Sequence, residues 1–213
     1  MSLQTTEFIV LRKTPYGESS MVVAGFSEGC GRLAFLVRGA RRLGRRDFPL
    51  VDLFRCLHVT FHHSERSSLN RWSSADRVHD FGPLAQHSAR YLGASTLARF
   101  LLRETAECAP LPRTYAALKT GLRRLATADA NAANDVLLPA VRIGILLTFL
   151  KENGELDQSS FAPDDCDRFH QLLEMAAGET VPPRLTAATW TRLDNWVQYL
   201  LDAADYRFEA LLY

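Results

Sequence analysis

Five arginines and no acidic residue lie within nine consecutive positions, and this run is the densest charge cluster of the sequence. Its members are Arg38, Arg41, Arg42, Arg45 and Arg46. An unpaired arginine is costly to bury, so we expect the cluster at the surface. The guanidinium group matches phosphate oxygens, and Gly39 and Gly44 let the backbone approach a ligand closely. A bare charge run is also typical of a solvated face, so phosphate binding needs support from the rest of the chain.

Charge is distributed unevenly between the two parts of the sequence. Residues 1–80 hold 12 Lys and Arg against 8 Asp and Glu, a net of +4. Residues 81–213 hold 13 against 16, a net of −3, which returns the overall +1. This asymmetry indicates a polyanionic partner for the first part only.

The histidines suggest a different chemistry, that of a metal-dependent phosphohydrolase. The candidate ligands are His58, His62, His79 and Asp80. Enzymes with a His-Asp pair of this kind present their metal ligands from several helices. Here the pair follows a strand-like segment and no matching upstream histidine lies on a predicted helix, so surface or interdomain histidines are the favoured interpretation.

The segments that must position the arginine cluster have strand character. From Glu7 to Val37, β-branched and aromatic residues alternate with a period of two, interrupted by turn residues at Pro15-Tyr16-Gly17 and at Glu28-Gly29-Cys30-Gly31. Strand character resumes over Pro49–His62 and, more weakly, over Ser67–Val78. Five short strands in about 80 residues favour an OB-type barrel over a sandwich, which usually needs about seven.

The predicted barrel is rich in aromatic residues, most of which must fill its core. They are Phe8, Tyr16, Phe26, Phe35, Phe48, Phe54 and Trp72. One or two left exposed beside the arginines would form a surface on which bases stack. The sequence does not decide which of them are exposed.

Helical periodicity replaces the alternation after Gly82-Pro83. Helices are predicted over 82–110, 114–128, 134–154, 164–177 and 186–208. The third is apolar almost all round and is expected to be central. The sequence therefore predicts an α+β protein with two domains, an OB-fold nucleic-acid-binding domain over 1–80 and an α-helical domain over 81–213.

Targeting and cysteine patterns give the expected compartment. The chain begins without the basic and apolar regions of a secretion signal, and its longest apolar stretch is too short to span a bilayer. The four cysteines are scattered with no C-x-x-C pair, which is typical of free thiols in an unexported chain. We therefore expect a cytoplasmic protein without a metal or other cofactor.

Four short segments follow one another in the N-terminal part: Ile9-Val10-Leu11-Arg12, Pro15-Tyr16-Gly17-Glu18-Ser19-Ser20, Gly31-Arg32-Leu33 and Arg38-Gly39-Ala40-Arg41-Arg42. Their order and spacing resemble the N-terminal signature of RecO, a family of bacterial recombination mediators. The rest of the chain agrees in layout, with a strand-rich continuation followed by an apolar helix. Many members also carry a four-cysteine zinc module after that helix, whereas the matching region Leu156–Cys166 is short and has one cysteine. The resemblance therefore implies an OB-fold domain joined to a helical domain, and no zinc module is expected.

The resemblance also implies a function. RecO proteins are non-enzymatic DNA-repair factors that bind single- and double-stranded DNA and anneal complementary strands. They interact with RecR and with the single-strand-binding protein, and so help the RecA recombinase load onto coated DNA. These are the partners and the activity that the resemblance implies for this chain.

Residues are carried over only where the motifs match. The resemblance transfers Arg32, Arg38, Arg41 and Arg42 as DNA contacts. Charge and position add four more, namely Arg12, Lys13, Arg45 and Arg46. In the helical part, Arg123 and Arg124 are candidates for receiving an acidic, apolar-ended protein tail.

One non-enzymatic alternative stays open beside DNA binding. The arginine loop would then meet an acidic patch on a partner protein, while DNA is contacted elsewhere or not at all. A salt-dependent complex with that partner, without binding to oligonucleotides, is its signature.

Overall fold

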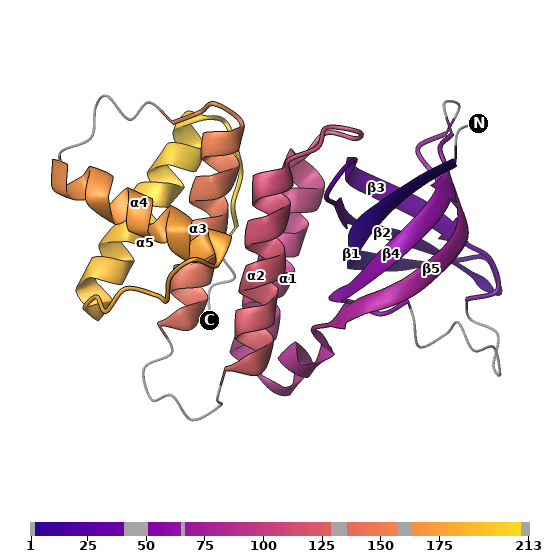
Figure 1. Cartoon of the computed structure of the whole chain (residues 1–213), viewed down its shortest axis with the longest axis horizontal. Helices are drawn as coiled ribbons and strands as arrows, with labels where there is room; N and C mark the ends of the chain where they lie inside the picture. Colours follow the sequence, from indigo (N-terminus) through magenta and orange to yellow (C-terminus); the bar gives the residue numbers. More distant parts are fainter. Residues whose placement is uncertain (1–2, 41–50, 65–66, 129–135, 157–162, 210–213) are drawn as a thin grey trace. The chain divides into compact units, whose positions relative to one another are not determined.

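The computed structural model describes residues 3–40, 51–64, 67–128, 136–156 and 163–209 (Figure 1). Arg41, Arg42, Arg45 and Arg46 of the predicted cluster lie outside these residues, as does Phe48. Residues 1–85 with 97–112 form one compact unit, and residues 86–96 with 113–213 form the other.

The first unit contains a closed five-stranded barrel (Figure 1). Its strands are β1 (Leu3–Tyr16), β2 (Ser20–Ser27), β3 (Gly31–Val37), β4 (Arg55–His62) and β5 (Asn70–Asp80). Neighbouring strands follow the order β1-β2-β3-β5-β4, and β4 closes back onto β1. All pairings are antiparallel except β3 with β5. This arrangement confirms the OB-type barrel that the sequence predicts.

The long strand β1 closes the barrel because it pairs on both of its edges. Its first half pairs with β4 from Leu3 to Ile9, and from Phe8 onward it pairs with β2. The register to β2 shifts between Val10 and Arg12, a bulge that bends the strand. Opposite the bend stands Gly25, where a Cβ atom would lie 2.0 Å from the Ile9 carbonyl oxygen. The tight coil at this corner therefore requires a glycine.

Aromatic rings fill the barrel around Phe35. The edge-to-face partners of this ring are Phe8, Phe61 and Trp72, at centroid distances of 5.0, 5.2 and 5.4 Å. Such T-shaped pairs add favourable electrostatics to the burial of apolar surface. The core of the first unit is therefore centred on the middle of β3.

Helices follow the barrel as the sequence predicts, with the bounds η1 (Gly82–Gln86), α1 (Ser88–Glu104), α2 (Pro112–Thr127), α3 (Leu137–Glu152), α4 (Pro163–Ala177) and α5 (Ala187–Ala203). The first predicted helix is divided into the 3-10 turn η1 and α1. The last predicted helix ends at Ala203 and not at Phe208. It stops early because Asp205 adopts a positive φ of 60° and the Tyr206 N–H bonds back to the Leu201 carbonyl, a left-handed C-terminal cap.

Helix α3 is the centre of the second unit, where it packs against α4 and α5 (Figure 1). It is buried on nearly all sides between Ala140 and Leu150, which confirms the central position predicted for it. Gly144 on α3 lets α4 approach closely, because a Cβ atom there would meet Met175 at 2.8 Å. In the described part of the chain, no helix is long and apolar enough to cross a membrane.

Two charged side chains fix the ends of α2. The carboxylate of Glu152 accepts hydrogen bonds from the backbone N–H groups of Arg113 and Thr114, at 2.9 and 2.7 Å, at the N-terminus of the helix. Arg90 is buried and donates to the Ala128 carbonyl oxygen at 2.7 Å at the other end. Both contacts place charge where the helix dipole favours it.

Candidate nucleic-acid interface

A groove of about 740 Å³ lies on the barrel where β3 meets β5. The two strands pair in parallel over only two positions, Phe35 with Asn70 and Leu36 with Arg71. The groove runs from the end of β3 along the first half of β5, with the edges formed by Arg38 and by Ser67 to Ala75. An OB barrel binds its nucleic-acid or sugar ligands on the face that includes β3 and the loop between β4 and β5, and this groove adjoins both.

Trp72 presents an aromatic surface to the groove. It is half-buried, stands opposite Phe61 in the sheet and packs its indole against the edge of Phe35. The core therefore holds the ring rigidly while part of it lines the groove. A fixed and partly exposed aromatic ring is the element on which unpaired bases stack.

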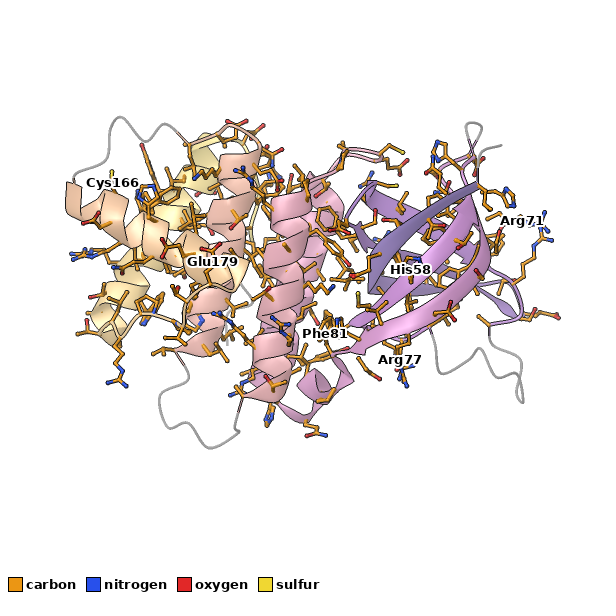
Figure 2. All side chains as sticks on the ribbon, in the orientation of Figure 1. His58, Arg71, Arg77, Phe81, Cys166 and Glu179 are labelled. Carbon is orange, nitrogen blue, oxygen red and sulfur yellow. The ribbon has the colours of Figure 1, made fainter. Side chains whose placement is uncertain are left out.

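The charges along the groove are positive. Arg38 and Arg71 both line it and both are exposed, and its lining contains no aspartate or glutamate among the residues that the structure describes. Neither arginine forms an ion pair with the residues that the structure describes, and Figure 2 shows Arg71 reaching outward from its strand. The groove thus combines one aromatic ring with two guanidinium groups that are available to phosphates.

Asn70 fixes the loop that forms one wall of the groove. Its side chain is 5% exposed, and its Oδ1 accepts a hydrogen bond from the Ser64 N–H at 3.1 Å. Its Nδ2 donates to the Ala34 carbonyl oxygen on β3 at 3.4 Å. Asn70 therefore ties the end of the β4–β5 connection to β3, next to Arg71.

The register of the sheet brings Tyr16 toward the same end of the barrel as Arg38. Pro15 pairs with Met21, and Met21 pairs with Val37, so Tyr16 and Arg38 each follow directly after this row. The Tyr16 side chain is 57% exposed. Of the other barrel aromatics in the described residues, Phe8, Phe26, Phe35 and Phe54 are buried, which leaves Tyr16 and Trp72 as the accessible rings.

Three further candidates from the sequence lie away from this groove. Arg12 is exposed on β1. Lys13 forms an ion pair with Asp52. Arg32 donates from Nη1 to the Leu102 carbonyl oxygen at 2.7 Å and from Nη2 to a Glu107 oxygen at 3.3 Å. Lys13 and Arg32 therefore already hold protein groups, whereas Arg38 does not engage a carboxylate in the described part of the chain.

Burial alone would raise the pKa of Asp52. Hydrogen bonds from Lys13 and from the Leu53 N–H outweigh that effect, so the pKa of Asp52 lies below its ordinary value. The contact ties Asp52, close to the C-terminal end of the arginine-rich connection, to strand β1.

The two candidates for protein binding lie on α2 in the second unit. Arg123 is exposed, whereas Arg124 is half-buried and donates from Nη2 to the Thr180 carbonyl oxygen. Burial, and then the charge of Arg123, lower the pKa of Arg124 below its usual value. Neither residue lines the 370 Å³ groove of this unit, whose basic residues include Arg113 and Lys151.

The histidine candidates do not form a metal cluster. His58 and His62 stand four residues apart on β4, which separates them by about 13 Å along the strand. Asp80 is engaged by Arg55 at 3.3 Å and Arg77 at 3.5 Å (Figure 2 labels His58 and Arg77). Among the described residues, no group of three or more His, Cys, Asp and Glu side chains is placed to hold a metal ion. The geometry therefore gives the phosphohydrolase interpretation no support.

Arg71 is the residue that sequence reasoning missed. It lies in the weakest predicted strand, and a single arginine beside a tryptophan is a faint signal. The signal becomes informative only when β5 is paired with β3, because that pairing brings Arg71 and Trp72 next to Arg38.

Comparisons with known proteins agree with this geometry. Residues 1–81 match the family model described as recombination protein O N terminal. Curated relatives named DNA repair protein RecO include one from Salinibacter ruber, 27% identical over 67% of this chain and 54% of the relative. Another, from Syntrophobacter fumaroxidans, is 28% identical over 65% of this chain and 54% of its own length. A third, from Bacillus pumilus, is 24% identical over 78% of this chain and 62% of its own.

The chain thus spans about half the length of the first of these relatives. The family match covers the whole barrel, including the groove residues Arg38, Arg71 and Trp72. A barrel followed by helices is the fold that the RecO resemblance implies. The resemblance of the N-terminal part to the RecO family is therefore confirmed over residues 1–81.

Proposed function

We propose that this chain is a non-enzymatic DNA-repair and recombination mediator whose barrel binds DNA through the groove between β3 and β5. The observation that carries the proposal is the composition of that groove, where Trp72 lies with two exposed arginines and, in the described part of the chain, no acidic residue. Guanidinium groups neutralise backbone phosphates and release counterions, while the indole stacks on a base. The names of the family relatives support a role in DNA repair.

Single-stranded DNA is the ligand that this groove suits best. Stacking on Trp72 requires an unpaired base, because bases within a duplex are already stacked on their neighbours. Duplex DNA offers phosphates only and would be held by the arginines alone. Both forms are therefore bound, and the single strand is bound more tightly.

The same parts account for strand annealing. The groove holds one strand, and the arginine run that begins at Arg38 screens the phosphates of the second strand. We assign the screening of the second strand also to Arg41, Arg42, Arg45 and Arg46, on the basis of their charge and sequence position alone. The division into a nucleic-acid-binding domain over 1–80 and a helical domain over 81–213 belongs to the same proposal.

Partners follow from the family likeness. The chain would act with RecR and with the single-strand-binding protein in the cytoplasm, at the nucleoid, and so help RecA load onto coated DNA. Arg123 is the more suitable of the two α2 arginines for a protein contact, because Arg124 already holds the Thr180 carbonyl group. The variant R123E tests this contact: it should weaken binding to the single-strand-binding protein and leave DNA binding unchanged.

The test of the function compares binding and annealing in one preparation. A labelled oligothymidylate, its duplex with oligoadenylate and a pair of complementary mixed-sequence strands are each added to the full chain. We expect salt-sensitive binding of both forms, tighter for the single strand, and faster pairing of the complementary strands. A quadruple alanine variant of Arg41, Arg42, Arg45 and Arg46 should lose annealing before it loses single-strand binding.

The protein-binding alternative predicts another outcome. An arginine loop that served an acidic protein patch would leave oligonucleotide binding absent, while a salt-sensitive complex with RecR formed. That pair of results would overturn the proposal that the barrel binds DNA.

A further inference from the structure

Two cysteines far apart in the sequence lie beside a backbone contact within the first unit. Cys30 lies in the turn between β2 and β3, and Cys108 lies in the segment that follows α1. Gly31 and Glu107, the residues next to them, form an isolated antiparallel bridge. Glu107 also forms a bridge with Arg32, so the segment that holds Cys108 lies against the start of β3, next to the turn that holds Cys30.

The packing around Gly31 brings the two backbones into direct contact. Gly31 has a φ of +65°, and a Cβ atom there would lie 2.0 Å from the Ala109 carbonyl oxygen. Cys108 is thus flanked by two residues, Glu107 and Ala109, that both touch Gly31. Cys30 directly precedes Gly31 and Cys108 directly follows Glu107, so each thiol is one residue away from this contact.

The two thiols differ in exposure. Cys108 is exposed and Cys30 is half-buried, with its Sγ 3.8 Å from Oε1 of Gln4, and both are free thiols. Burial raises the pKa of Cys30; a hydrogen bond with Ser27 opposes the rise, and the nearby Cys108 adds to it. The thiols are therefore close enough for the charge of one to act on the other.

We propose that Cys30 and Cys108 form a modification site for peroxides, at which they are joined in a disulfide. The exposed Cys108 thiolate attacks a peroxide oxygen, which breaks the O–O bond and gives a sulfenic acid and one water. The Cys30 sulfur then attacks the Cys108 sulfur and displaces the hydroxyl group, which leaves as a second water. The two thiols lose two electrons and two protons to hydrogen peroxide.

The bond would secure a contact that Arg32 already makes. Arg32 links β3 to the Leu102 carbonyl group and to Glu107, the residue before Cys108. A disulfide beside it fastens the segment after α1 to the β2–β3 turn. Oxidation therefore keeps Arg32 engaged with protein groups and makes this part of the first unit harder to unfold.

The test uses the full chain treated with a small excess of hydrogen peroxide and then alkylated with iodoacetamide. Trypsin should release residues 14–32 joined to residues 104–113 from monomeric protein, and a reductant should separate them. The melting midpoint of the oxidised protein should rise by about 5 °C and fall back on reduction. The variant C166S, which removes a thiol outside the pair, should behave like the parent chain.

The variants C30S and C108S separate the two chemical steps. Without Cys30, the sulfenic acid on Cys108 should persist and be captured by dimedone, whereas in the parent chain it should not accumulate. Without Cys108, Cys30 should stay alkylatable. The proposal is overturned if the parent chain accumulates the sulfenic acid, forms only dimers between chains, or joins other cysteines. None of these readouts depends on DNA binding.

Discussion

Replacing Arg38 and Arg71 together with alanine tests the charge of the groove most simply. Both side chains are exposed and form no ion pair with the described residues, so their removal should leave the barrel folded. Each phosphate contact with a single strand contributes about 0.7 to the slope of log affinity against log salt concentration. The double variant should therefore lower the magnitude of that slope by about 1.4, and affinity should fall most at low salt.

The assay is fluorescence anisotropy of a labelled oligothymidylate titrated at several salt concentrations. The matched control is R77A, because Arg77 lies on the same strand β5, pairs with Asp80 and does not line the groove. R77A should leave the slope close to that of the parent chain. An equal loss of slope in R77A and in the double variant would show that total charge matters and not the groove.

Three further predictions concern the framework. Gly25→Ala should destabilise the chain by about 2 kcal/mol in chemical denaturation, because its Cβ would strike backbone, whereas the roomier Gly29→Ala should cost far less. Glu152→Ala should lower the free energy of unfolding by about 1 kcal/mol, because the N-terminus of α2 loses its acceptor; an unchanged denaturation midpoint would contradict the capping role. The depressed pKa of Asp52 means that its contact with Lys13 stabilises the fold above the ordinary carboxyl pKa and is lost as pH falls through the lower folded value. Between pH 5 and pH 2, the free energy of unfolding of D52N should therefore fall less than that of the parent chain. Since this pair is partly exposed, the difference should be less than about 1 kcal/mol in urea denaturation.

The barrel could be predicted from the sequence because strand periodicity is a local signal. Its first four strands are rich in β-branched and aromatic residues, and turn residues mark most of their ends. The fifth strand gave a weak signal because most of its residues beyond Asn70 are exposed, so few apolar side chains mark a face. Its place between β3 and β4 depends on pairing with residues far away along the chain.

The candidate site was predictable in kind but not in detail. Arg38 was identified from its cluster, and it lines the groove. The contact between Arg32 and Glu107 joins residues 75 positions apart, which no local pattern reveals. The exposure of Trp72 likewise follows from the packing of Phe35 against only part of its ring, a property of the folded core.

In the helical part too, one feature had a local sequence signal and another did not. An apolar stretch marked α3 as central, because a helix without a polar face must be covered on all sides. The end of α5 was misplaced, because a left-handed cap formed by an aspartate has a weaker sequence signature than one formed by glycine.

The central claim is that a DNA strand lies in the groove against Trp72, and the emission of this tryptophan measures it directly. In a variant with Trp190 and Trp196 replaced by phenylalanine, Trp72 is the remaining tryptophan, and oligothymidylate should quench its fluorescence saturably and reversibly with salt. The midpoint of quenching should match the midpoint of binding measured by anisotropy on the same oligonucleotide. Binding by anisotropy with unchanged Trp72 emission would place the DNA elsewhere and contradict the account.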